Sequence, residues 1–74
     1  MAGKRRAQKR RNAEIRQAVE AMQGIRRELS QAENVFNHMT DPHQMDACIF
    51  EINALKARYN CAVLDVNRAA APPS

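Results

Sequence analysis

The stretch Met39-Thr40-Asp41-Pro42-His43-Gln44-Met45 separates two long runs that contain no proline, and it predicts where the chain reverses direction. Asp is a favoured residue at the N-cap of a helix, and Pro is well suited to the first helical turn. Gln44 follows Asp41 by three residues, which completes a capping-box pattern. One helix should therefore end just before this stretch, and a second helix should begin at Pro42.

The run before the turn places apolar residues alternately three and four positions apart. This is heptad spacing, which gives a helix a single apolar face. We predict a first helix over about residues 13–39. Its apolar seam consists of Ile15, Ala18, Met22, Ile25, Leu29, Ala32, Phe36 and Met39.

The run after the turn repeats this spacing and predicts a second helix over about residues 42–69. Its seam consists of Met45, Cys48, Ile52, Leu55, Tyr59, Ala62, Val66 and Ala69. With a turn at about 40–42 and a frayed C-terminus at 71–74, residues 13–70 should form an antiparallel two-helix hairpin. The fold class is all-α, in agreement with the few aromatic, Gly and Pro residues.

The second helix carries another apolar stripe, on roughly the opposite side from its seam. Polar rows separate the two stripes, and the first helix can cover only one of them. The second stripe consists of Ala47, Phe50, Ala54, Ala57, Cys61 and Leu64. We expect it to bind a second copy of the chain, which gives a homodimeric four-helix bundle, or else a helical partner protein.

The N-terminal residues 1–12 are strongly basic, and we predict a disordered tail. Six of the twelve Lys and Arg residues of the chain lie here, namely Lys4, Arg5, Arg6, Lys9, Arg10 and Arg11. They are candidate contacts for the phosphates of a nucleic acid, bound without sequence preference. The alternatives are a solubilising tail, an exposed extension of the first helix, or attraction to an acidic membrane or protein surface.

Length and cysteine content limit the setting in which the protein works. A chain of 74 residues buries little apolar surface alone, so help from a partner is expected. Cys48 and Cys61 lie too far apart along one helix to form a disulfide with each other. No apolar run resembles a secretory signal or a membrane span. We therefore expect a cytoplasmic protein.

Residues around the turn resemble the YaaL-like family of short bacterial proteins of unknown function. The similar segments are Phe36-Asn37-His38-Met39-Thr40-Asp41-Pro42, Asp46-Ala47-Cys48-Ile49-Phe50-Glu51 and Ala54-Leu55-Lys56-Ala57-Arg58-Tyr59. The resemblance covers roughly residues 29–66. It implies a bacterial, cytosolic, helical protein and supplies no catalytic residues.

Candidate chemistry is sparse. The residues His38, Asp41, His43, Asp46 and Cys48 cluster near the turn, but their spacing matches no zinc motif, and a helix cap with a solvated loop is the better interpretation. There is no pattern of nucleophile and base, no phosphate-binding loop and no pair of catalytic carboxylates. We predict no enzymatic activity, no cofactor, no metal and no small-molecule substrate, and favour an interaction or assembly module.

Overall fold

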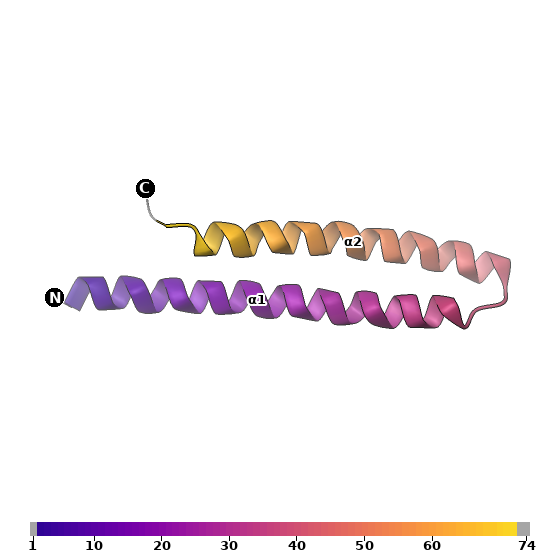
Figure 1. Cartoon of the computed structure of the whole chain (residues 1–74), viewed down its shortest axis with the longest axis horizontal. Helices are drawn as coiled ribbons and strands as arrows, with labels where there is room; N and C mark the ends of the chain where they lie inside the picture. The colour runs from indigo at the N-terminus through magenta and orange to yellow at the C-terminus, as the bar shows by residue number, and fades with distance from the viewer. Residues whose placement is uncertain (1, 73–74) are drawn as a thin grey trace.

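Two long helices pack side by side and run in opposite directions (Figure 1). The computed structural model describes residues 2–72, apart from the side chains of Ala2 and Lys4. Helix α1 spans Ala2–Asn37 and helix α2 spans Pro42–Ala70. The molecule is a rod with extents of 62 × 19 × 11 Å. The all-α hairpin predicted from the sequence is confirmed.

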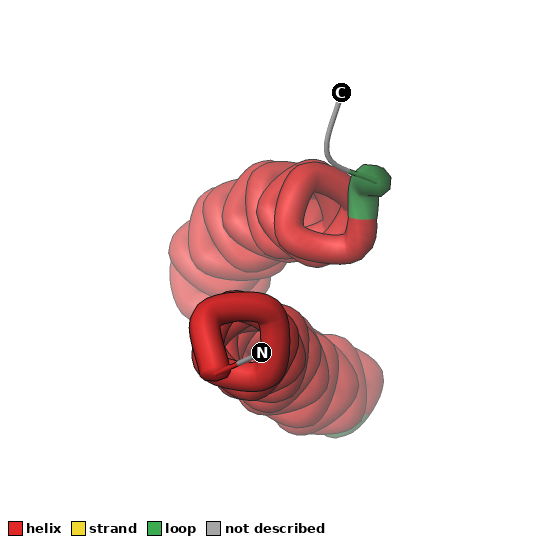
Figure 2. The backbone as a smooth tube through the Cα atoms, turned by 90° about the vertical axis from the view of Figure 1, so that its left-hand side faces the viewer, coloured by secondary structure: helices red, strands yellow, loops and turns green. Residues whose placement is uncertain are grey.

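The helices coil around each other along their length. Viewed along the rod, α1 and α2 drift to opposite sides with increasing depth, in the left-handed sense (Figure 2). An α-helix has 3.6 residues per turn, whereas both seams repeat every 3.5 residues on average. The helices must therefore supercoil in this direction to keep their seams in contact.

The two predicted seams meet and form the apolar contact between the helices. The most buried side chains are those of Ala32, Cys48, Ile52, Leu55 and Ala62, with exposed fractions between 5% and 9%. Ile25, Leu29, Phe36 and Met39 are partly buried and pack against the part of this core nearest the turn. Every residue of both seams is buried or half-buried. Each helix thus contributes a single apolar face to the core.

The turn reverses the chain without a glycine. His38 and Met39 donate backbone hydrogen bonds to the carbonyls three residues earlier, at 3.1 Å each, so the end of α1 tightens before the chain departs. Asp41 is then extended, with φ −81° and ψ 118°, and its carboxylate accepts a hydrogen bond from the backbone N–H of His43 at 2.9 Å. Pro42 follows in the first turn. The predicted N-cap is confirmed, whereas α1 ends two residues earlier than predicted.

The basic N-terminal segment departs from the sequence-based prediction. The sequence predicted a disordered tail over residues 1–12, whereas α1 already begins at Ala2, in line with the alternative of an exposed helix extension; Met1 lies outside the described residues. Ala, Lys, Arg and Gln are all good helix formers, and adding residues to an existing helix avoids the cost of nucleation. The cations therefore stand on a helix.

A side chain of α1 ties the open end of the hairpin together. The Nη2 atom of Arg11 donates hydrogen bonds to the backbone carbonyls of Ala70 and Ala71, at 3.1 and 2.6 Å. The last carbonyls of a helix lack partners within the helix, and a cation there also interacts favourably with the helix dipole. Helix α2 ends at Ala70, and Arg11 links this end to α1. Of residues 71–74, which were predicted to fray, Ala71 and Pro72 lie beyond the helix, and residues 73 and 74 lie outside the described part.

Candidate interaction surface

The side of α2 that faces away from α1 is apolar and open to solvent. We call it the outer face, and it consists of Ala47, Phe50, Ala54, Ala57, Cys61 and Leu64. All six residues are exposed, with 76% of Phe50 and 56% of Leu64 accessible. Isolated apolar residues on a surface are common, but six at helical spacing along one face form a continuous stripe. The structure thus places the predicted second stripe on one uncovered surface.

Polar side chains border the outer face on both sides, and all of them are exposed. One row contains Asp46, Asn53, Asn60 and Asn67. The other row contains Glu51, Arg58 and Asp65. An apolar centre with a polar border is the usual composition of a protein–protein interface.

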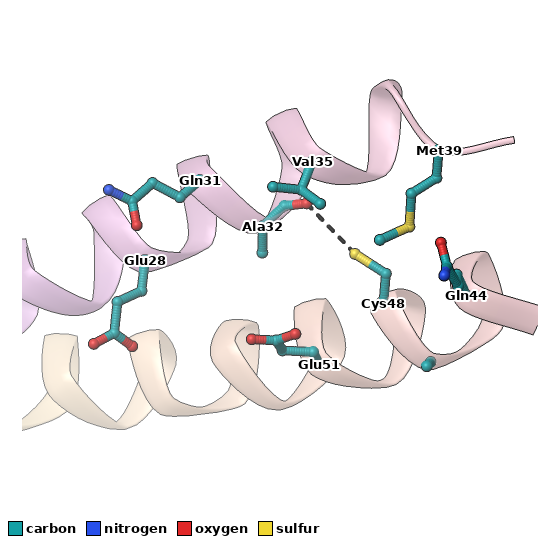
Figure 3. A pocket seen from close by; sticks show the side chains of 9 residues that line it. Glu28, Gln31, Ala32, Val35, Met39, Gln44, Cys48 and Glu51 are labelled. Atoms are coloured by element: carbon teal, nitrogen blue, oxygen red, sulfur yellow. Dashed lines mark hydrogen bonds between the residues drawn. The ribbon is translucent and has the colours of Figure 1, made fainter. Parts of the chain in front are cut away.

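A shallow groove of about 470 Å³ lies beside the outer face, near the turn (Figure 3). Ala32 and Cys48 form its floor, and Glu28 from α1 and Glu51 from α2 border it. Ala47, a residue of the outer face, also lines the groove. The groove therefore continues the outer face toward α1 and adds negative charge at its edge.

Sequence reasoning missed this groove, although the sequence holds a signal for it. Glu28, Gln31 and Val35 contribute its α1 side and are spaced three and four positions apart, which places them on one flank of that helix. Val35 is 51% exposed. Its exposure enlarges the apolar surface next to α2.

The two cysteines lie on opposite faces of α2. Cys48 is 5% exposed and its thiol donates a hydrogen bond to the carbonyl of Ala32 at 3.5 Å (Figure 3). Cys61 is exposed on the outer face, and both thiols are free. One thiol is thus part of the hairpin core, whereas the other is available to reagents and partners.

Two of the polar side chains near the turn, those of His38 and Asp41, have structural partners. The Nδ1 atom of His38 donates to the carbonyl of Asn34 at 2.7 Å, and Asp41 caps α2. Within residues 2–72, no three His, Cys, Asp or Glu side chains lie together as a metal site would require. His38 and Asp41 thus bond to the helix ends on either side of the turn.

The predicted phosphate-binding cations do not form one group. Arg5, Arg6, Lys9 and Arg10 are exposed along the first turns of α1, and the side chain of Lys4 lies outside the described part. Arg11 is half-buried and engages the end of α2. Arg11 therefore links the two helices, whereas the other four described cations are exposed to solvent.

Comparison with known proteins gives no relative for this chain. No family model, no curated protein and no solved structure matches it. Neither helix, over the described residues, has a segment long and apolar enough to cross a membrane.

Proposed function

We propose that the protein is a non-catalytic helical assembly module that forms a homodimer through the outer face of α2. In the dimer, the α2 helices of the two copies pack together at the centre and the two α1 helices lie outside, which gives a four-helix bundle. The observation that carries this proposal is the exposure of Phe50 and Leu64, at 76% and 56%, on a face where every apolar position is open.

The small core of the hairpin supports the need for a partner. The most buried side chain in the described residues is still 5% exposed, and the core cluster is concentrated near the turn. Full burial of a large apolar side chain contributes about 1.5–3 kcal/mol. Covering Phe50 and Leu64 would therefore add stability that is large for a chain of this length.

A second copy is the partner that the bordering charges favour. The row beside the outer face contains both Glu51 and Arg58, so the same row on another copy offers the opposite charges. A two-fold dimer uses the same patch on both subunits and requires such self-complementarity. The small residues Ala54 and Ala57 in the middle of the face permit close approach of a second helix.

The cellular setting is part of the same proposal. Two free thiols suit a reducing compartment such as the cytoplasm. The Thr40-Asp41-Pro42 turn, with Arg58 and Tyr59, supports membership of the YaaL-like group of small bacterial proteins. The resemblance supplies no catalytic residues, which agrees with a role in assembly.

The test is the molar mass of the full chain by light scattering, with two matched variants. Ala57→Glu places a charge in the middle of the outer face, and Lys56→Glu makes an acidic substitution at the neighbouring exposed position outside it. The wild-type protein and Lys56→Glu should have twice the 8.4 kDa mass of one chain, whereas Ala57→Glu should be a folded monomer. A dimeric Ala57→Glu, or a monomeric wild-type protein, would refute the proposal.

Binding of nucleic acid through the N-terminal end of α1 is the second candidate function. Arg5, Arg6, Lys9 and Arg10 are exposed, and the first turn of the helix has no acidic residue. Cations repel one another at four-residue spacing and are unfavourable at a helix N-terminus. Phosphate groups nearby would relieve both effects, which favours anion binding without base recognition.

Salt dependence and charge reversal test this second function. Binding of a short duplex DNA, followed by fluorescence anisotropy, should weaken by about 0.9 log unit per log unit of salt for each phosphate neutralised. Reversing Arg5, Arg6 and Arg10 to Glu should abolish binding and leave the dimer intact. Reversal of three exposed cations further along α1, Arg16, Arg26 and Arg27, is the matched control and should have a smaller effect. Equal losses in both triple variants would assign any binding to net charge alone.

A further inference from the structure

The positions of the outer face read the same in both directions along α2. Successive residues are three, four, three, four and three positions apart, symmetric about the point between Leu55 and Lys56. A two-fold axis through this point reverses one helix relative to the other. It brings the residues into facing layers: Ala54 against Ala57, Phe50 against Cys61, and Ala47 against Leu64 of the other copy.

In the antiparallel layers, large residues face small ones. Phe50, 76% exposed, would lie against Cys61 of the second copy, and Leu64 would lie against Ala47 of the second copy. Alternation of large and small side chains across facing positions is how helices fill the space between them. In a parallel pair, Phe50 would instead meet Phe50, and the alanines would meet alanines and leave a gap. Shape therefore favours the antiparallel orientation.

The bordering charges distinguish the two orientations as well. In the antiparallel pair, Glu51 of one copy and Arg58 of the other copy differ by only two positions in height along the helix axis, about 3 Å at 1.5 Å per residue. Symmetry forms this ion pair twice. On the other border, Asn53 and Asn60 of the second copy are likewise two positions apart in height.

A parallel pair would combine the borders differently. Asp46 of one helix would lie beside Glu51 of the other, five positions further along, which is the usual interhelical pairing in parallel coiled coils. By the same rule Arg58 would lie beside Asn53, so the parallel pair lacks both Glu51–Arg58 ion pairs. Repulsion between carboxylates five positions apart occurs in either orientation, because in the antiparallel pair Asp65 lies five positions in height from Glu51 of the second copy. Charge and shape thus select the same orientation.

We propose that a second copy of this chain occupies the outer face in antiparallel orientation, with Phe50 of each copy packed on Cys61 of the other and Glu51 paired with Arg58. This register rests on the proposed dimer and defines its interface. It also shields the exposed thiol of Cys61. The two Cys61 residues lie eleven positions apart in height, roughly 16 Å, which is too far for a disulfide between them.

Disulfide trapping tests the register directly in the full chain. In Phe50→Cys, the introduced thiol should lie opposite Cys61 of the second copy, and oxidation by diamide should give a covalent dimer. The wild-type protein should give none, because its exposed thiols are far apart. Phe50→Cys combined with Cys61→Ser should also give none, which controls for random collision.

Charge exchange provides a second measurement that keeps Phe50 in place. Glu51→Arg or Arg58→Glu alone should weaken the dimer about tenfold, and the double variant should recover most of this loss. Within one chain, positions 51 and 58 are seven residues apart, about 10 Å along α2, so recovery must arise between copies.

The possible outcomes separate the register from the proposed function. A monomeric wild-type protein removes both. A wild-type dimer that is cross-linked through Cys61 to Cys61 keeps the proposed function and overturns the antiparallel register. The register is also overturned if the double charge variant does not recover dimer affinity and the Phe50→Cys variant forms no disulfide-linked dimer.

Discussion

The two faces of α2 are built from similar residues and have opposite environments. The inner face holds Cys48 and Leu55, each 5% exposed, and the outer face holds an exposed Cys61 and Leu64, which is 56% exposed. The difference arises because α1 is a single helix and can cover only one side of its neighbour. Apolar spacing alone therefore identifies two contact surfaces on α2, and the hairpin occupies one of them.

Replacing one leucine on each face should reveal the difference between the two faces with the largest effect. Leu55→Ala removes a buried side chain, and such changes cost about 2–5 kcal/mol. Since a hairpin of this size has little stability in reserve, the variant should lose most of its helical circular dichroism at 25 °C. Urea unfolding measures the loss where the variant still folds.

Leu64→Ala is the matched control on the outer face. In the Ala57→Glu background, where the proposed dimer is absent, it should change the free energy of unfolding by about 0.5 kcal/mol or less. In the otherwise wild-type chain it should weaken the dimer. Equal destabilisation by both leucine substitutions in the monomer would show that the two faces do not differ as described.

Removal of the helix cap should have the next largest effect. Asp41→Ala deletes the acceptor for the His43 N–H and should destabilise the hairpin by about 0.5–2 kcal/mol. Asp41→Asn keeps a side-chain oxygen and should cost much less. Because this cap fixes where α2 begins, Asp41→Ala should weaken the packing of the inner face of α2 against α1 before it changes the outer face. Urea unfolding of the two variants checks this, and a loss as large in Asp41→Asn would rule out the cap as the cause.

Replacing a glycine in α1 should stabilise the hairpin without touching the outer face. A methyl group at Gly24 would meet only the Nη2 atom of Arg27, at 3.9 Å, which is an ordinary contact. Gly24→Ala should therefore add about 0.5–1 kcal/mol to the free energy of unfolding through helix propensity. Gly3→Ala, at the end of the helix, should add less, and both variants should keep the wild-type molar mass. No gain in the melting temperature of Gly24→Ala would contradict the open space seen beside it.

Loss of the link at the open end should have the smallest effect on overall stability. The hydrogen bonds from Arg11 to the carbonyls of Ala70 and Ala71 are exposed to solvent, so Arg11→Gln should cost at most a few tenths of a kcal/mol. Amide hydrogen exchange should accelerate at the C-terminal end of α2. Arg10→Gln, which removes an exposed cation beside it, is the control and should leave these amides unchanged.

The sequence was sufficient to predict the hairpin because each local signal agreed with the others. The alternation of three and four placed every seam residue correctly, and Asp41 and Pro42 located the turn. Charge misled the prediction at residues 2–12, where good helix formers continue α1 despite mutual repulsion. The hydrogen bonds of Arg11 join residues far apart in sequence, so only the packed structure reveals them. The spacing of Glu28 and Val35 places them on one flank of α1, but that α2 lies beside this flank and forms a groove follows only from the packing.

Thiol labelling as a function of protein concentration tests the two-faced description of α2 most directly. Mass spectrometry of peptides would follow the reaction of Cys48 and Cys61 with N-ethylmaleimide in the same wild-type sample. Cys48 should react slowly at every concentration, because the hairpin itself buries it. Cys61 should react quickly at low concentration and slow down as the dimer forms. If Cys61 keeps the rate of a free thiol at all concentrations, the outer face does not bind a second copy.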